Sequence, residues 1–159
     1  MLRSPRVWMY AAGGWLLLAG LAHATAHVWL FVLENEFYGY REFAMNAMKQ
    51  AESLDPLRPS MWRQFRMFSV GYGLLLGFAG VVDIVLARTA AQSSVLKSVA
   101  LLGTVFWTIA FGLFAFVDPI LQAILVSAVA VPLHAIAYVT ADHEARVDAP
   151  NSLDGPSAS

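Results

Sequence analysis

Four long apolar stretches alternate with shorter polar segments along the chain. They lie at residues 8–33, 65–87, 99–117 and 120–138. A helix that crosses a membrane needs about 20 mostly apolar residues, and each stretch comes close to or exceeds this length. The pattern predicts an all-α protein, an integral membrane four-helix bundle that forms one domain over residues 1–141.

The polar segments between these spans differ in length. Residues 34–64 and 88–98 separate the first three spans, whereas only Asp118 and Pro119 separate the last two. Asp118 is suited to cap the fourth helix, and proline is favoured in a first turn because its missing N–H needs no partner there. A tight hairpin is therefore expected at this junction. Residues 142–159, rich in Asp, Ala, Pro and Ser, are expected to form a disordered polar tail.

The long first connector contains a second helical pattern, at residues 37–54. On a helical projection, its apolar side chains fall on one face and its polar side chains on the other. The apolar face consists of Phe37, Tyr40, Phe43, Ala44, Ala47, Met48, Ala51 and Leu54. This pattern is typical of an amphipathic helix at a membrane interface, and a lid over a cavity is the alternative interpretation.

Composition supports the membrane assignment and narrows the chemistry. The chain is 58% hydrophobic and 13% charged, whereas soluble domains have about 45–50% and about 25%. It has no cysteine, which excludes Cys-ligated metals and thiol catalysis. The net charge is −1 without a block of like charges, so no nucleic-acid partner is expected. The sequence patterns of the common hydrolases and metalloproteases are absent, which argues against an enzyme.

The charged residues also indicate an orientation. Basic residues are equally numerous on the two sides, but Arg3 and Arg6 precede the first span and Glu34 and Glu36 follow it. Basic residues favour the cytoplasmic side, so both termini are expected there, in a bacterial cytoplasmic membrane. The small residues near position 24 would also suit a signal-peptide cleavage site, but the apolar run continues to residue 33.

Small and polar side chains mark one face of each span, as expected where helices pack against each other in lipid. On the second span, Gly73 and Gly77 form a GxxxG pattern on the face that also carries Arg63, Arg66 and Ser69. The corresponding faces of the other spans carry Ala12, Ala19, Gly20, His23, His27 and Glu34; Lys97, Thr104 and Thr108; and Ala123, Ser127, Ala130 and His134. These faces predict a polar seam inside the bundle.

Three histidines of this seam are candidates for a metal or haem site. His23 and His27 are one helical turn apart, a spacing that lets two imidazoles bind one metal ion, and His134 lies on the fourth span. Glu34 shares the stripe but lies about 10 Å beyond His27 along the helix. A haem held by His23 and His134 would require equal depths, whereas counting from the span centres places them about 11 Å apart.

Two other interpretations of the histidines stay open. Neutral imidazoles could form interhelical hydrogen bonds to hydroxyl groups, for which Thr104, Thr108 and Ser127 are the expected partners. A proton-handling or ligand-binding role is the other interpretation, since ionisable groups inside a membrane are usually functional. Asp83, near the end of the second span, is expected to pair with Arg88 rather than to relay protons.

Arg63 and Arg66 open the second span at the level where the first span ends. One interpretation is ion pairing with acidic residues of the connector, such as Glu34. The other is binding of an anionic head group or substrate, because arginine offers a fork of donors that fits carboxylate or phosphate. The ligand-binding candidates are therefore Arg63, Arg66, Glu34 and, as an aromatic wall, Trp62.

These features favour a non-catalytic binding or accessory component of the membrane with no cofactor. Its expected partners are the lipid bilayer and either a second copy of the chain or another membrane protein. The alternative is a metal- or haem-dependent redox protein that acts on a lipid-like or quinone-like ligand. A transporter ranks third, because four short spans would have to dimerise to enclose a pathway.

Overall fold

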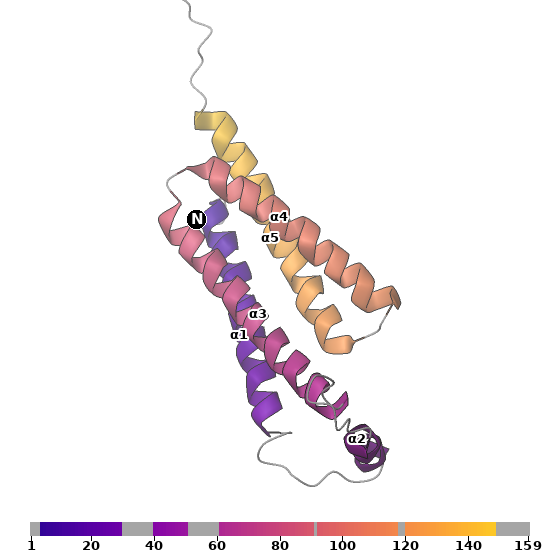
Figure 1. Cartoon of the computed structure of the whole chain (residues 1–159). Helices are drawn as coiled ribbons and strands as arrows, with labels where there is room; N and C mark the ends of the chain where they lie inside the picture. The colour runs from indigo at the N-terminus through magenta and orange to yellow at the C-terminus, as the bar shows by residue number, and fades with distance from the viewer. Residues whose placement is uncertain (1–3, 30–39, 51–60, 91, 118–119, 149–159) are drawn as a thin grey trace, which may run out of the picture. The chain divides into compact units, whose positions relative to one another are not determined.

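The computed structural model describes residues 4–29, 40–50, 61–90, 92–117 and 120–148 (Figure 1). Within these residues the chain forms five α-helices and one π-helical turn and contains no strand. They are α1 (Pro5–Val28), α2 (Tyr40–Gln50), α3 (Met61–Thr89), α4 (Ser93–Gly112), η2 (Leu113–Val117) and α5 (Leu121–Asp148). The predicted all-α class is confirmed.

Four of these helices are long and apolar enough to cross a membrane. They are α1, α3, α4 continued by η2, and α5 as far as Glu144. Each falls on one of the four predicted stretches. The helices α1 and α3 begin about one turn earlier than predicted, because hydropathy marks the apolar part of a helix and not its polar first turn. Residues 30–33 and the predicted hairpin residues Asp118 and Pro119 lie outside the described residues.

The contacts divide the chain into two units. The first unit comprises residues Met1–Leu16 and Ala79–Ser159, and the second comprises Leu17–Phe78. The first half of α1 and the last turns of α3 therefore belong to the same unit as α4 and α5. The second half of α1 and the rest of α3 belong to the same unit as α2. Each unit is described separately.

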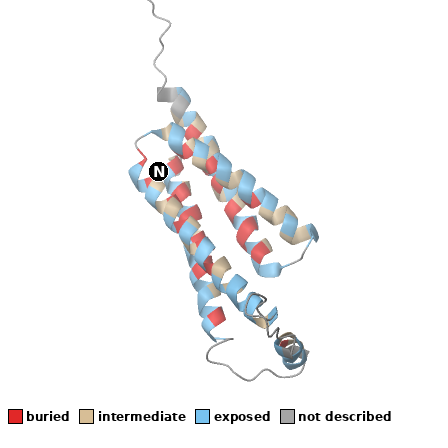
Figure 2. Cartoon of the chain, in the orientation of Figure 1, coloured by how far each residue is buried: buried red, intermediate tan, exposed pale blue. Residues whose placement is uncertain are grey.

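In the first unit, α4 and α5 lie side by side as a helical pair (Figure 1). Figure 2 shows buried residues recurring along α5 between exposed ones. The core cluster consists of Met9, Ala87, Ala90, Leu96, Ala100 and Ala137. Alanine dominates this cluster because small side chains allow helix backbones to approach closely. The same rule applies at Gly13, where an added Cβ would lie 2.6 Å from the Gly80 carbonyl oxygen.

In the second unit, α1 and α3 meet at the predicted glycine pattern. An added Cβ on Gly20 would lie 2.8 Å from the Gly77 nitrogen and 2.9 Å from the Gly73 carbonyl oxygen. The GxxxG pattern of Gly73 and Gly77 is therefore a packing contact within this unit. No side chain other than hydrogen fits at Gly20 without moving a backbone.

The helix α2 covers residues 40–50 of the helix predicted at 37–54, and the flanking positions lie outside the described residues. Its faces differ from the projection. Met45, which is not on the predicted apolar face, is only 7% exposed, whereas Phe43, which is on that face, is 72% exposed. A helical projection shows which side chains share a face but not which face is buried. In the structure, the buried side chain is Met45 and the exposed one is Phe43.

The helix α5 continues further than expected, to Asp148. Residues 142–148, predicted as the start of a disordered tail, are therefore helical, and residues 149–159 lie outside the described residues. The helix also runs through Pro132.

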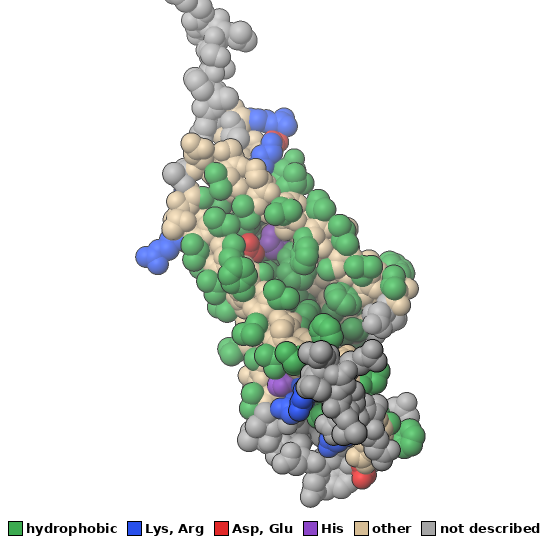
Figure 3. All heavy atoms as spheres, in the orientation of Figure 1, with side chains coloured by type: hydrophobic (Ala, Val, Ile, Leu, Met, Phe, Trp, Pro, Cys, Tyr) green, Lys and Arg blue, Asp and Glu red, His purple; other side chains and the backbone are tan. Residues whose placement is uncertain are grey.

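On the face of the molecule in Figure 3, hydrophobic side chains cover much of the surface of the long helices.

Candidate functional site

The second unit contains a pocket of about 580 Å³. It is lined by His27 from α1 and by Trp62, Arg63, Arg66, Met67, Val70, Gly71 and Leu74 from α3. Three of the four predicted ligand-binding residues, Arg63, Arg66 and Trp62, therefore line one pocket. The fourth, Glu34, lies outside the described residues.

Helical periodicity explains why α3 supplies most of the lining. Positions 63, 66, 67, 70, 71 and 74 recur at intervals of three and four residues, and so share one face of the helix. The two arginines come from the first two turns of α3, and Met67, Val70, Gly71 and Leu74 follow them along the helix. The lining thus combines cationic and apolar side chains, which would suit a ligand that has an anionic head and an apolar chain.

Electrostatics at the cationic end favour an anion. The first turn of a helix carries the positive end of the helix dipole, where a cation is less stable by about 0.3–1 kcal/mol per charge. Arg63 and Arg66 lie close to that end of α3, and both are exposed. An anion bound between them would be attracted by both guanidinium groups and by the helix terminus.

Aromatic contacts fix the wall formed by Trp62. Its indole stacks on the ring of Phe65, with centroids 6.2 Å apart and planes 17° from parallel. The Lys49 amine lies 5.7 Å from the centroid of the indole ring, a cation–π contact between α2 and α3. The helix α2 therefore contacts Trp62, which is one of the pocket-lining residues.

The hydroxyl of Ser69 connects the two histidines of α1. Nε2 of His23 lies 2.9 Å from the Ser69 carbonyl oxygen and 3.0 Å from Ser69 Oγ. Nδ1 of His27 lies 2.9 Å from the same Oγ. Since a carbonyl oxygen only accepts, His23 carries its hydrogen on Nε2 when it binds the Ser69 carbonyl. The Ser69 hydroxyl therefore joins the imidazoles of His23 and His27.

His23 itself is enclosed by α3. Its ring makes an edge contact with Tyr72, with centroids 5.2 Å apart, and an added Cβ on Gly73 would lie 3.3 Å from its Cδ2 atom. Its Nδ1 atom is buried and has no hydrogen-bond partner among the described residues. The close approach of the helices at Gly20 and Gly73 is what lets a histidine of α1 reach Ser69.

The metal prediction for His23 and His27 gains no third ligand from the described part of the chain. Among those residues, no group of three or more His, Asp and Glu side chains could hold a metal ion. Glu34, the predicted oxygen ligand, lies outside them. The metal and haem interpretation therefore stays a prediction.

The third histidine, His134, has a partner that the sequence analysis did not assign. In the first unit its Nε2 atom lies 3.1 Å from Asp83 Oδ2, and its Nδ1 atom lies 2.8 Å from the Ala130 carbonyl oxygen. Both residues are buried. The expected pairing of Asp83 with Arg88 is wrong, because the carboxylate of Asp83 turns to α5.

The predicted hydroxyl partners of the histidines are also wrong. Thr104 donates to Ala100, Thr108 to Thr104 and Ser127 to Ala123, in each case to a carbonyl oxygen one turn earlier on the same helix. Hydroxyl groups in apolar helices commonly satisfy themselves in this way. The histidines do form interhelical hydrogen bonds, but with Ser69 and Asp83.

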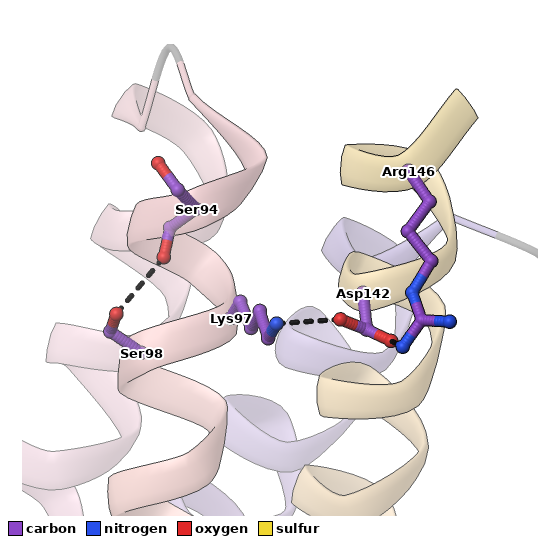
Figure 4. A network of polar contacts seen from close by, with 5 residues as sticks. All are labelled: Ser94, Lys97, Ser98, Asp142 and Arg146. Carbon is purple, nitrogen blue, oxygen red and sulfur yellow. Dashed lines mark hydrogen bonds and ion pairs between the residues drawn. The ribbon is translucent and has the colours of Figure 1, made fainter. Parts of the chain in front are cut away.

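A polar network that the sequence analysis missed joins the ends of α4 and α5 (Figure 4). Asp142 accepts a hydrogen bond from Lys97 of α4 and pairs with Arg146 one turn later on α5, at 2.8 Å. The Lys97 amine also lies 5.6 Å from the centre of the Tyr138 ring. The i, i+4 spacing of Asp142 and Arg146 is a signal that could have predicted the helical end of α5.

Together these observations define an all-helical protein with four helices of membrane-spanning length, a cation-rimmed pocket and a buried Asp–His pair. Comparison with protein-family models, curated proteins and solved structures finds no match to this chain. Its function is therefore inferred from its own residues.

Proposed function

We propose that this chain is an integral membrane protein that crosses the bilayer four times, through α1, α3, α4 with η2, and α5. The support is the apolar surface of these helices. On α4, for example, Leu102 is 69% exposed, and Phe106 and Ile109 are each 59% exposed. Burial of such surface in lipid is strongly favourable, whereas in water it would promote aggregation. The proposal includes both termini on the cytoplasmic side of a bacterial membrane, because Arg3 and Arg6 precede the first span and Glu34 and Glu36 follow it.

Within that setting, the proposed function is non-catalytic binding of an anionic amphiphile in the pocket of the second unit. The observation that carries the proposal is the order of the lining. Arg63 and Arg66 line it from the first two turns of α3, and Val70 and Leu74 line it from later turns of the same helix. A carboxylate or phosphate head group would bind the arginine forks, and its hydrocarbon chain would follow the apolar wall.

The interfacial position of α2 belongs to the same proposal. Its Lys49 contacts Trp62, and its exposed Phe43 offers an apolar group to the lipid head-group region. Such a helix lies at the depth where the heads of amphiphiles are found. An accessory component of this kind would present its ligand to a partner membrane protein or to a second copy of the chain.

The alternative function is metal- or haem-dependent redox chemistry on a quinone-like ligand. One observation favours it: the buried Nδ1 of His23 has no hydrogen-bond partner in the part of the chain that the structure describes, and it could act as a ligand atom. Metal analysis and a visible absorption spectrum of the purified protein test it. Near-stoichiometric metal or a haem band that is lost in His23→Ala would support the redox function over the accessory one.

The binding proposal is tested by native mass spectrometry or lipid exchange in detergent. We expect the wild-type protein to retain phosphatidylglycerol or a long-chain fatty acid in preference to phosphatidylcholine. The double variant Arg63→Gln/Arg66→Gln should bind the anionic lipid at least about tenfold more weakly, since each charge-assisted hydrogen bond contributes about 1.5–3 kcal/mol. A comparison of the two anionic lipids shows whether phosphate or carboxylate is preferred.

A matched control is available on the same helix. Arg88 is exposed at the last turn of α3 and does not line the pocket, so Arg88→Gln should bind as the wild type does. Gly71→Leu tests the pocket without changing charge, because an added Cβ at this lining residue meets nothing within 4 Å. Equal loss of binding in Arg88→Gln and in the double variant would show nonspecific attraction and contradict the proposal.

A further inference from the structure

The buried pair of Asp83 and His134 belongs to the first unit and takes no part in the pocket. The side chain of His134 is 1% exposed and that of Asp83 is 10% exposed. Both residues lie on helices proposed to cross the membrane, α5 and α3. A free charge in such surroundings is strongly disfavoured, so the protonation state of the pair matters for stability.

Hydrogen-bond partners determine how many protons the pair holds. The Ala130 carbonyl oxygen, 2.8 Å from His134 Nδ1, can only accept, so Nδ1 carries a hydrogen. The contact of 3.1 Å between Nε2 and Asp83 Oδ2 then needs one more proton. Either Nε2 carries it and donates to a carboxylate, or the carboxyl group carries it and donates to the lone pair of Nε2. Both arrangements have a net charge of zero.

Two glycines on neighbouring helices leave room for the side chains of the pair. An added Cβ on Gly103 of α4 would lie less than 3 Å from three atoms of the His134 ring. An added Cβ on Gly13 of α1 would lie 3.0 Å from Asp83 Cβ. At Gly13 and Gly103, α1 and α4 therefore bring their backbone close to the pair.

Other titratable groups of this unit lie among the described residues of α1, α3, α4 and α5. On α1, Arg6 donates to the Ala90 carbonyl oxygen and Tyr10 is 42% exposed. On α3, Arg88 is exposed, and on α4, Lys97 binds Asp142. The remaining titratable side chains described on α5 are Tyr138, Asp142, His143, Glu144 and Arg146. The partner that the structure gives to His134 Nε2 is Asp83 alone among these groups.

We propose that Asp83 and His134 form a proton-binding site inside the helical bundle, which holds a single proton between Nε2 and Oδ2. Loss of that proton leaves a carboxylate facing a nitrogen lone pair, two acceptors in contact and one uncompensated negative charge. Gain of a second proton leaves one uncompensated positive charge. The protein takes up or releases a proton here only at a cost in stability.

The sign of the pH effect follows. Stability is highest while the pair holds one proton, falls as pH rises and the shared proton is lost, and falls again at acidic pH as a second proton binds. In Asp83→Asn, the amide N–H can donate to the Nε2 lone pair of a neutral imidazole. This variant keeps the hydrogen bond and has no shared proton to lose, so its stability should not share the alkaline fall at this site.

The experiment is the melting temperature of the purified full chain in detergent as a function of pH. We expect the wild type to lose several degrees at both ends of the range, and Asp83→Asn to lose them only at the acidic end. Asp83→Leu, which leaves Nε2 without a partner, should melt lower at every pH. An alkaline fall of the same size in wild type and Asp83→Asn, or no alkaline fall in the wild type, would overturn the proposal.

Two further measurements keep the test decisive if Asp83→Asn does not fold. In ¹⁵N-histidine-labelled wild-type protein, His134 Nδ1 should stay protonated while the Nε2 signal changes at alkaline pH, and an unprotonated Nδ1 would refute the site. Gly103→Ala should displace the imidazole and weaken the pH dependence, whereas Gly112→Ala, on the same helix with open space at its Cβ, should leave it unchanged. The proposal depends only on residues of the first unit, so its failure leaves the pocket proposal intact.

Discussion

At the level of single residues, Gly20 controls how closely α1 and α3 pack in the second unit. Its missing side chain leaves room for the backbone of Gly73 and Gly77, and that close contact brings His23 within reach of Ser69. A methyl group at this position would have to push a backbone away, since backbone atoms have no other rotamer to adopt. Small residues at such contacts are the main determinants of helix packing in membranes.

We therefore expect Gly20→Ala to destabilise the protein by about 1–3 kcal/mol, the usual effect of overpacking. Gly14→Ala, on the same helix but with nothing within 4 Å of the added Cβ, should be neutral or stabilising by up to about 1 kcal/mol. Unfolding in detergent, followed by circular dichroism, measures both. Equal stability of the two variants would mean that the close contact is absent.

The sequence predicted these residues better than it predicted their partners. Periodicity placed Gly20, His23 and His27 on one face and Ser69, Gly73 and Gly77 on another, and the structure brings these two faces together. It could not predict which atoms meet, because that depends on the axial offset and rotation between two helices. For this reason Ser69 was not singled out, and Asp83 was assigned to Arg88 rather than to His134.

At the level of elements, the pairing of α4 and α5 depends on polar contacts at their ends as well as on alanine packing. Asp142 holds Lys97 of the neighbouring helix and Arg146 of its own, which extends α5 into the segment predicted as a tail. Hydropathy predicted the apolar centre of each span, but a polar helix end has the composition of a linker. Such an end is predictable only from its charge spacing, and the bond to Lys97 only from the pairing of the helices.

Removal of the carboxylate should therefore loosen the end of α5. We expect the backbone amides of residues 143–148 to exchange with deuterium at least several-fold faster in Asp142→Ala than in the wild type, because both charged partners are lost together. The neighbouring exposed residue gives the control, since His143→Ala removes a side chain of the same turn without touching the network. Unchanged exchange in Asp142→Ala would show that packing alone holds the helix end.

At the level of the whole molecule, the four long helices expose apolar side chains that only lipid or protein partners could cover. The polar groups within these helices are few and mostly satisfied, by backbone carbonyls one turn away or by one another, as in the Ser69 cluster and the Asp83–His134 pair. Such internal hydrogen bonding is required within a membrane, since no water is available there to replace a missing partner. Composition therefore predicted long apolar helices, and the polar exceptions within them mark the two proposed sites.

The proposed topology can be tested because the chain contains no cysteine. Single cysteines can then be introduced at exposed positions on the two sides, Ala47→Cys on α2 and Gln92→Cys between α3 and α4. With both termini in the cytoplasm, one span separates the N-terminus from α2 and two spans separate it from residue 92. A membrane-impermeant maleimide should therefore label Ala47→Cys in intact cells, and Gln92→Cys only after the membrane is permeabilised. The reverse pattern would invert the orientation and place the arginine-lined pocket on the cytoplasmic side, whereas labelling of both positions in intact cells would contradict the four-span arrangement.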